Sequence, residues 1–276
     1  MLLLALPLGV VIGLSLGALG GGGSVLTVPA LVYLLGQEPR VAITSSLLIV
    51  GVTALMGLVP HARAGRVRFG HGLTFGLLGT VGSLAGSRLS VKVSPAVLLA
   101  IFATLILVVA VLMLRPTPRA ADGTTDADID IDATMEAGRV GDARTPTRSY
   151  DARRVALLVG TATAVGLLTG FFGVGGGFAI VPALVLVLDV PMAVAVGTSL
   201  LVIAVNSATA LAARAQLATE LDWALIATFT GAAVVGSLLG SRVVARVPSA
   251  RLKQTFAVLL VVVALYTGVQ SLTALI

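Results

Sequence analysis

The 276-residue sequence contains no cysteine. A chain without thiols forms no disulfide bond, binds no metal through thiolates and has no cysteine nucleophile. The sequence also lacks the G-x-S-x-G and H-E-x-x-H motifs and shows no pair of aspartates inside an apolar run. We therefore expect a protein that is not an enzyme and binds no metal or cofactor. The enzymatic alternative is an intramembrane hydrolase, for which these motifs would be needed.

Charged residues are scarce as well, at 11% of the chain, whereas soluble domains contain about 25%. Hydrophobic residues make up 57%, and the mean hydropathy is +1.08. One aqueous core could not hide this much apolar surface, so the lipid bilayer is the expected solvent. The 4% of aromatic residues and the 32 glycines are typical of helical membrane bundles, in which small residues let helices approach closely.

Ten apolar runs follow one another along the chain. They are continuous rather than alternating, which argues against a transmembrane β-barrel. The runs cover residues 2–19, 24–35, 41–59, 71–89, 95–114, 155–172, 178–188, 191–212, 222–241 and 254–275. The first has no charged n-region or cleavage site, so we expect a retained helix rather than a signal peptide. The second run of each set, with about 12 residues, reaches only about 18 Å into a core about 30 Å thick.

The two sets of runs are internal repeats. "GGSVLTVPALV" aligns with "GGGFAIVPALV", which places Pro29 on Pro182, and "TSSLLIV" aligns with "GTSLLVI", which places Ser46 on Ser199. Both matches have an offset of 153 residues, and "GSLAGSRL" aligns with "GSLLGSRV" at an offset of 154. Three matches in one order indicate a duplication.

This duplication divides the chain into a first transmembrane repeat (1–114), a linker (115–154) and a second transmembrane repeat (155–276). The linker contains eight acidic and seven basic residues and almost no large apolar side chains. It cannot bury enough surface to fold alone, so we expect a disordered, solvated tether.

The parity of the runs predicts how the repeats are oriented. Each half crosses the membrane five times, or three times if its short second run pairs with the first as a re-entrant hairpin. Both numbers are odd, so the halves should be inverted repeats, a common transporter plan. The expected fold is an all-α polytopic transmembrane bundle of two inverted repeats, each with a short broken or re-entrant helix after a glycine-rich break.

Basic residues predict which side is cytoplasmic. The linker and the loops at 60–70 and 242–253 carry 14 of the 18 Lys and Arg residues, and these three segments fall on one side. The positive-inside rule then makes the linker cytoplasmic and places both termini outside the cell membrane. The net charge of +6 therefore reports topology, and we expect no nucleic-acid partner. A homo-oligomer is left open.

Glycine breaks precede both short runs, in "GGGGS" and "GVGGG". Lipid cannot satisfy the backbone groups that a break frees, so a break survives inside protein or beside a wet cavity. The new helix begins with free N–H groups and a partial positive charge, which together favour an anion. The substrate-binding candidates from the breaks are Gly21, Gly22, Gly23, Ser24, Gly175, Gly176 and Gly177.

One structural reading competes with an anion site, and the prolines have a structural role of their own. The break glycines could serve only close helix packing, as the four-residue spacing of Gly9, Gly13, Gly17 and Gly21 suggests. Pro29 and Pro182 are structural candidates, because a proline inside each short run prevents a regular helix. We expect the two breaks to meet near the middle of the membrane with their N–H groups facing the pathway.

Hydroxyl and amide side chains complete the candidate set. Those in the third run of each half either hydrogen-bond an oxyanion or bond back to their own helix. Asn206 is an amide in the middle of the apolar run 191–212, and it either contacts substrate or joins two helices. The candidates are Thr44, Ser45, Ser46, Thr198, Ser199 and Asn206.

With these motifs in place, the sequence resembles the TauE/SafE family of sulfite exporter-like permeases. The resemblance rests on "GGGGSVLTVPAL" and "GFFGVGGGFAIVPAL", each followed by "TSSLL" or "GTSLL" and later by "GSR". It covers both halves, and the long linker departs from it. The resemblance implies a multi-pass inner-membrane permease for sulfite, sulfonates and related sulfur anions.

The expected function is therefore a secondary transporter of small sulfur-containing anions. Export is favoured because a cell that is negative inside drives an anion outward, by about 2.3 kcal/mol per charge per 100 mV. The alternatives are a transporter of another small organic or inorganic anion, and a membrane scaffold that transports nothing.

Overall fold

Helices form nearly all of the described part of the chain. The computed structural model describes residues 2–90, 93, 95–114, 152–172, 177–188, 190–212, 214, 221–244 and 246–275. The elements are α1 Leu2–Leu19, α2 Gly22–Pro29, η1 Ala30–Leu34, α3 Pro39–Arg63, α4 Phe69–Ser90, α5 Pro95–Leu114, α7 Ala152–Phe172, α8 Gly177–Pro182, η2 Ala183–Val187, α9 Met192–Ala212, α10 Trp223–Val244 and α11 Ser249–Leu275. No strand occurs within these ranges, so the predicted all-α class is confirmed.

Each predicted apolar run lies in a helix or in an α-helix followed by a π-helix, the element labelled η. The predicted linker lies outside the described residues, except for its last three residues, which form the start of α7 at Ala152. The prediction that the linker is a disordered tether therefore stays a prediction.

The packing pattern is unchanged when the two halves are exchanged. Helix α1 packs along α10, and its counterpart α7 packs along α4, the counterpart of α10. Helix α3 packs on α9, α5 on α11 and α2 on α8, so in each of these pairs a helix contacts its own counterpart in the other half. This is the arrangement expected of a duplicated sequence, whereas the inverted orientation of the halves in a membrane stays a prediction.

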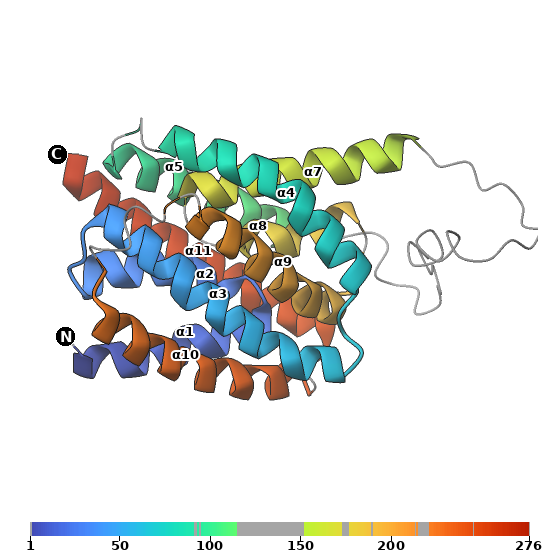
Figure 1. Cartoon of the computed structure of the whole chain (residues 1–276), viewed down its shortest axis with the longest axis horizontal. Helices are drawn as coiled ribbons and strands as arrows, with labels where there is room; N and C mark the ends of the chain where they lie inside the picture. The colour runs from blue at the N-terminus through green and yellow to red at the C-terminus, as the bar shows by residue number, and fades with distance from the viewer. Residues whose placement is uncertain are drawn as a thin grey trace, which may run out of the picture.

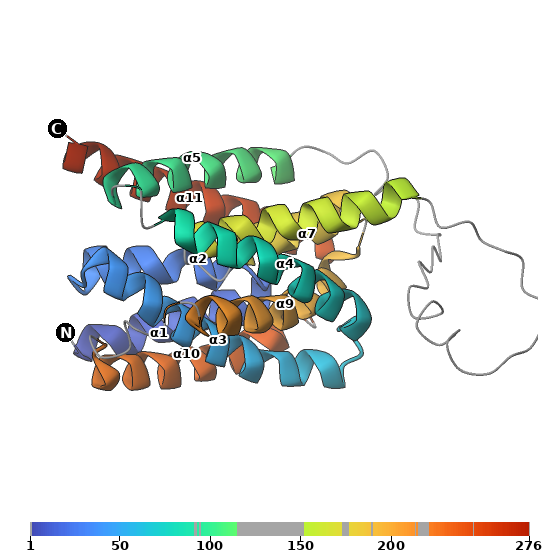
Figure 2. The ribbon, with the colours of Figure 1, turned by 45° about the horizontal axis from the view of Figure 1, so that its top comes forward.

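Each short helix folds back along the helix that precedes it. In Figure 1, α1 runs away from the end that carries both termini, and α2 with η1 returns toward that end. Helix α7 starts at the opposite end, and α8 with η2 returns there. Figure 2 again shows the N- and C-termini at one end of the bundle. The short runs therefore form hairpins with α1 and α7.

The prolines mark the point where both short helices change type. Pro29 ends α2 and Pro182 ends α8, and a π-helix follows each. Proline lacks the N–H that would continue the i to i−4 ladder. The wider turn closes with the N–H of Leu35 on the carbonyl of Ala30, at 3.1 Å, and with Leu188 on Ala183, at 3.3 Å. The predicted interruption of a regular helix at both prolines is confirmed.

Glycines allow the closest helix crossings. A Cβ on Gly13 would overlap the Ala233 carbonyl, and one on Gly236 would overlap the Val10 carbonyl, so α1 and α10 touch backbone to backbone. At the equivalent crossing of α4 with α7, a Cβ on Gly86 would overlap the Leu167 carbonyl. The packing role predicted from the four-residue glycine spacing is confirmed at these crossings.

The outer surface suits a bilayer. Four described helices are long and apolar enough to cross a membrane: Pro39–Arg63, Met192–Ala212, Trp223–Val244 and Ala250–Val269. Large apolar side chains point outward from the bundle, including Val81 (69% exposed) and Val269 (64% exposed). Water would penalise such exposure, at about 25 cal/mol per Å² of apolar surface, whereas lipid does not.

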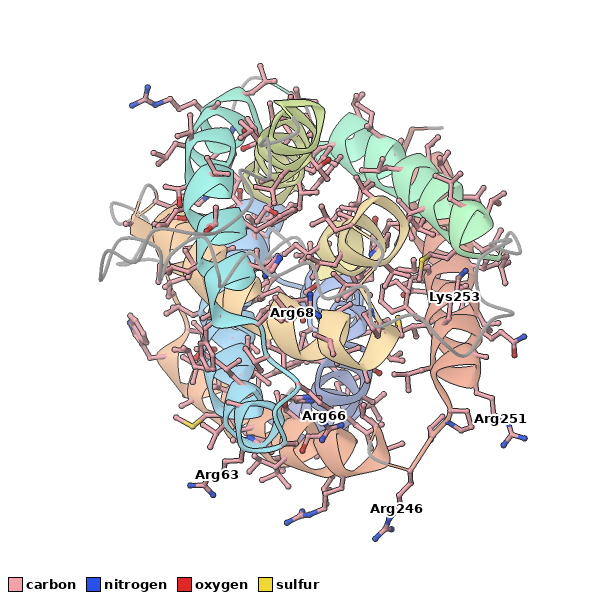
Figure 3. The ribbon with its side chains drawn as sticks, turned by 90° about the vertical axis from the view of Figure 1, so that its right-hand side faces the viewer. Arg63, Arg66, Arg68, Arg246, Arg251 and Lys253 are labelled. Atoms are coloured by element: carbon pink, nitrogen blue, oxygen red, sulfur yellow. The ribbon has the colours of Figure 1, made fainter. Side chains whose placement is uncertain are left out.

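Basic side chains gather at the end of the bundle opposite the termini. Figure 3 looks onto this end and labels Arg63, Arg66, Arg68, Arg246, Arg251 and Lys253. The loops predicted to share one side therefore do so for the described residues. Helix α3, which carries Arg40 at its start, begins at the other end.

Candidate functional site

The two glycine breaks meet inside the bundle. A Cβ on Gly21 would overlap the carbonyl oxygen of Gly177, and a Cβ on Gly177 would lie 2.7 Å from the Gly21 Cα and from the Ser24 Oγ. Helix α2 runs from this contact toward the end with the termini, and α8 runs toward the basic end. Gly21 of the first break therefore meets Gly177 of the second, and the starts of two short helices lie side by side. The predicted position near the middle of the membrane stays a prediction.

The first break uses some of its own N–H groups. The N–H of Gly20 donates to the Leu16 carbonyl and that of Gly21 donates to the Leu19 carbonyl, both at 2.8 Å. Gly20 has φ +71°, a left-handed conformation that favours glycine. The prediction that all break N–H groups face a pathway is thus wrong for Gly20 and Gly21. The N–H groups of Gly22, Gly23 and Ser24 start α2, where no helical acceptor exists.

Only part of the predicted glycine set lies at the junction. A Cβ on Gly23 would overlap the Ile12 carbonyl of α1, and one on Gly22 would lie 2.8 Å from a Leu259 methyl group. These two glycines therefore let α2 pack against α1 and α11. Gly21 and Gly177 form the contact itself, while Gly175 and Gly176 lie outside the described residues.

Most of the candidate hydroxyls bond to their own helices. Ser24 donates to Gly21, Ser46 to Ile43 and Ser199 to Val196, each to the carbonyl and each at 2.8 Å. The Thr44 hydroxyl donates to the Arg40 carbonyl at 3.1 Å. Back-bonding, one of the two roles predicted for the third run of each half, describes Thr44, Ser46 and Ser199, and Ser24 behaves in the same way.

Thr198 and Ser45 behave differently, although they occupy equivalent positions in the repeats. The Thr198 hydroxyl accepts a hydrogen bond from the backbone N–H of Arg68 at 3.1 Å, which ties α9 to the 64–68 loop. The Ser45 hydroxyl is fully buried and has no partner among the described residues. Of the six predicted hydroxyl candidates, Ser45 alone has its hydrogen-bonding capacity unused within the described structure.

One face of α9 passes along the junction. The Ser199 hydroxyl lies against Gly20, and the Ile203 side chain lies 2.8 Å from the Cβ position of Gly177. One turn further, Asn206 faces Gly79 of α4, whose Cβ position is 3.2 Å from the amide oxygen of Asn206. This face therefore connects both breaks with the α4–α7 crossing.

Asn206 is the most unusual polar residue on that face. It is fully buried, as predicted, and neither its amide oxygen nor its amide nitrogen has a hydrogen-bond partner among the described residues. A buried amide left unpaired costs about 1–3 kcal/mol. The predicted role of joining two helices by hydrogen bonds has no support in the described contacts, and a contact with substrate stays a prediction.

Aromatic packing around the second break was not anticipated from the sequence. Phe172 ends α7 and Phe178 lies near the start of α8, and both rings lie against Phe102 of α5, with centroid distances of 5.1 and 5.4 Å. The two phenylalanines flank "GVGGG" in the sequence, and this spacing could have indicated that their rings pack together beside the break. Their packing fixes the two sides of the break relative to each other.

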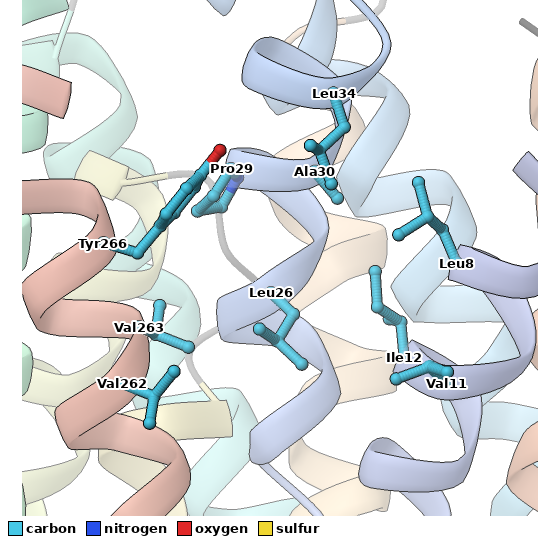
Figure 4. Close-up of a pocket in the computed structure, with 10 residues that line it drawn as sticks. All are labelled: Leu8, Val11, Ile12, Leu26, Pro29, Ala30, Leu34, Val262, Val263 and Tyr266. Atoms are coloured by element: carbon cyan, nitrogen blue, oxygen red, sulfur yellow. The ribbon is translucent and has the colours of Figure 1, made fainter. Parts of the chain in front are cut away.

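An apolar cavity of ≈ 250 Å³ lies beside the first hairpin, as Figure 4 shows. Side chains of α1, α2 and α11 line it, with η1 at one end, and the Tyr266 hydroxyl is the polar group among them. Val11 and Val262 are more than half exposed, so the cavity opens toward lipid. An anion would find almost no donors here, and this cavity is distinct from the junction of the breaks.

Comparison with known proteins assigns the chain to transport proteins. Residues 5–267 match the family described as "Sulfite exporter TauE/SafE". A "Probable membrane transporter protein" of Xylella fastidiosa (strain Temecula1 / ATCC 700964) is 32% identical over 96% of this chain and 94% of its own length. The "Probable membrane transporter protein YunE" of Bacillus subtilis (strain 168) is 32% identical over 85% of this chain and 86% of its own. No solved structure matches significantly.

Proposed function

The chain belongs to the sulfite exporter TauE/SafE family of membrane transporters, and from that premise we propose that it is a secondary transporter for small sulfur-containing anions such as sulfite or organosulfonates. The observation that carries the proposal is the contact of Gly21 with Gly177, which brings the starts of two short helices together inside the bundle. Two helix starts supply partial positive charge and backbone N–H donors to one place.

Charge distribution supports an anionic substrate. The described helices around the junction bring no carboxylate to it: α1, α2, α8 and α9 contain no Asp or Glu. The starts of α2 and α8 therefore act without a competing negative charge. Elsewhere in the bundle, the buried Ser45 hydroxyl and the Asn206 amide beside Gly79 are neutral polar groups that the described contacts leave unused.

The arrangement at the junction corresponds to a closed state of the pathway. The backbones of Gly21 and Gly177 touch, so an anion reaches the helix starts only after the breaks separate. We propose that the halves are inverted repeats and that one moves against the other, opening the junction alternately toward each end. The glycine crossings of α1 with α10 and of α4 with α7 each join a helix of one half to a helix of the other, so the halves would have to pivot or slide at these crossings.

Topology and direction complete the proposal. The basic end shown in Figure 3 is cytoplasmic in this scheme, and both termini face outward from the cell membrane. A monovalent anion then leaves the cell down the electrical gradient, so export requires no coupled ion. A second candidate substrate class is small carboxylates, because backbone N–H donors also suit carboxylate oxygens.

Proteoliposome transport tests the proposal. Purified protein should carry labelled sulfite or taurine faster than protein-free liposomes do, and an inside-negative potential should accelerate sulfite efflux. Acetate carried faster than both sulfur compounds would move the assignment to the carboxylate alternative. Absence of flux for all three compounds, with folded protein in the membrane, would contradict the transport proposal and favour a scaffold.

A further inference from the structure

The carbonyl of Gly17 is left without its helical partner by the first break. In a continuous helix it would accept the N–H of Gly21, but that N–H donates to the Leu19 carbonyl instead. The Nε2 of His61, from the last turn of α3, lies 3.0 Å from the Gly17 oxygen. A carbonyl only accepts, so Nε2 is the donor in this contact. His61 therefore satisfies a backbone group that the break has freed.

The second half repeats this contact with a different side chain. The Nη2 of Arg214, just after α9, donates to the Gly170 carbonyl at 3.0 Å and to the Ser90 hydroxyl at 3.2 Å. Residues 61 and 214 differ by 153, and so do residues 17 and 170, which is the repeat offset. Both pre-break helices thus have an equivalent carbonyl held by a basic side chain from the end of the third run.

The two side chains differ in how they respond to pH. Burial lowers the pKa of the Arg214 guanidinium from its ordinary value, but arginine stays protonated across the physiological range. Imidazole titrates near pH 6.5 in water. The group that holds the Gly170 carbonyl in the second half therefore keeps its charge, whereas the group that holds the Gly17 carbonyl in the first half can change its protonation state.

At the His61 position, the described residues offer a protonated imidazole neither an acceptor for its second N–H nor a negative charge. The residue is fully buried, and its Nδ1, which protonation turns into a second donor, has no partner among the described residues. The surrounding elements carry little charge: α1, α2 and α9 have no ionisable side chain, η1 has Tyr33 and α10 has Arg242, which is exposed. The basic groups of the neighbouring segment are Arg63 and Arg66, and the charge of Arg66 acts on the imidazole.

We propose that His61 and Arg214 are equivalent positioning residues that hold the ends of α1 and α7 at the breaks, and that protonation of His61 releases the α1 end while the α7 end stays held. A buried cation with one carbonyl partner, next to arginines, is unfavourable, so acid moves the imidazole outward and leaves Gly17 unsatisfied. Acidification would then loosen the first hairpin alone.

Hydrogen exchange of the intact protein in lipid nanodiscs tests this without any substrate, so its outcome is independent of the transport proposal. Exchange is measured from about pH 8 to about pH 5 and corrected for the intrinsic pH dependence. Peptides covering 16–22 should lose up to about tenfold protection per pH unit once His61 protonates. Peptides covering 166–172 should show no such change.

Three variants make the result specific. His61→Gln keeps a donor for the Gly17 carbonyl but does not titrate, so the pH dependence at 16–22 should disappear. His71→Gln removes the other imidazole of the chain and should leave it intact. Arg214→His should create a pH dependence at 166–172. Equal protection at 16–22 across the pH range in the natural protein, or an unchanged response in His61→Gln, would overturn the proposal.

Discussion

Gly177→Ala is expected to reduce anion flux at least tenfold while leaving the protein folded and in the membrane. The added Cβ would lie 2.7 Å from the Gly21 Cα and from the Ser24 Oγ, and 2.8 Å from a methyl group of Ile203. Backbone cannot yield to it as a flexible side chain would, so the starts of α2 and α8 must move apart. A displacement of about 1 Å in a preorganised site costs about 100-fold in function for enzymes, and we expect a similar sensitivity here.

Gly160→Ala provides the matched control for this substitution. Gly160 lies on α7 and has no atom within 4 Å of its Cβ position, so the same chemical change meets open space. Flux per folded protein, measured in proteoliposomes after size-exclusion analysis of both variants, should stay at the natural level for Gly160→Ala. Natural flux in Gly177→Ala as well would show that the glycine contact serves packing alone.

Asn206→Leu is expected to have opposite effects on stability and on transport. Leucine has nearly the same shape as asparagine, and it removes an amide whose two polar atoms are buried and unpaired among the described residues. The free energy of unfolding should rise by about 1–3 kcal/mol, the usual cost of such an unsatisfied group. Flux should fall at least tenfold, because the amide is the candidate contact for the passing anion.

Thr53 offers the control, because it occupies the position equivalent to Asn206 in the first half. Its hydroxyl is buried but donates to the Ile49 carbonyl, so it is already satisfied. Thr53→Val should change flux less than twofold. Thermal unfolding and flux are measured on the same preparations. An Asn206→Leu protein that is less stable and transports normally would assign the amide to helix packing.

Much of this architecture could be predicted because the sequence is duplicated. The alignment of Pro29 with Pro182 predicted paired interruptions, and both prolines do end an α-helix at equivalent points. The glycine spacing predicted backbone crossings because only glycine allows two helices to come so close. Asn206 was predicted to be buried because lipid does not accommodate an amide.

Other features depended on geometry that spacing does not encode. Whether the Ser46 and Ser199 hydroxyls face a substrate or their own helix is decided by a single rotamer, and both donate to carbonyls three residues earlier. The pairing of His61 with Gly17 depends on which carbonyl the break leaves free, and spacing does not encode that the N–H of Gly21 donates to the Leu19 carbonyl. Aligning residues 61 and 214 at the repeat offset would have singled out both basic side chains.

The most direct test of the central claim, that the junction of the breaks is the transport site, is alkylation of Ser24→Cys. The natural chain has no cysteine, so this variant contains one thiol, at a position 2.7 Å from the Cβ position of Gly177. Proteoliposomes are treated with N-ethylmaleimide and washed, the modified fraction is determined by mass spectrometry, and flux of labelled sulfite is then measured. The account predicts that Ser24→Cys is modified as the junction opens and that flux falls in proportion to the modified fraction, while the cysteine-free protein is unaffected. Full flux after complete modification, or a thiol that stays unmodified while the protein transports, would contradict it.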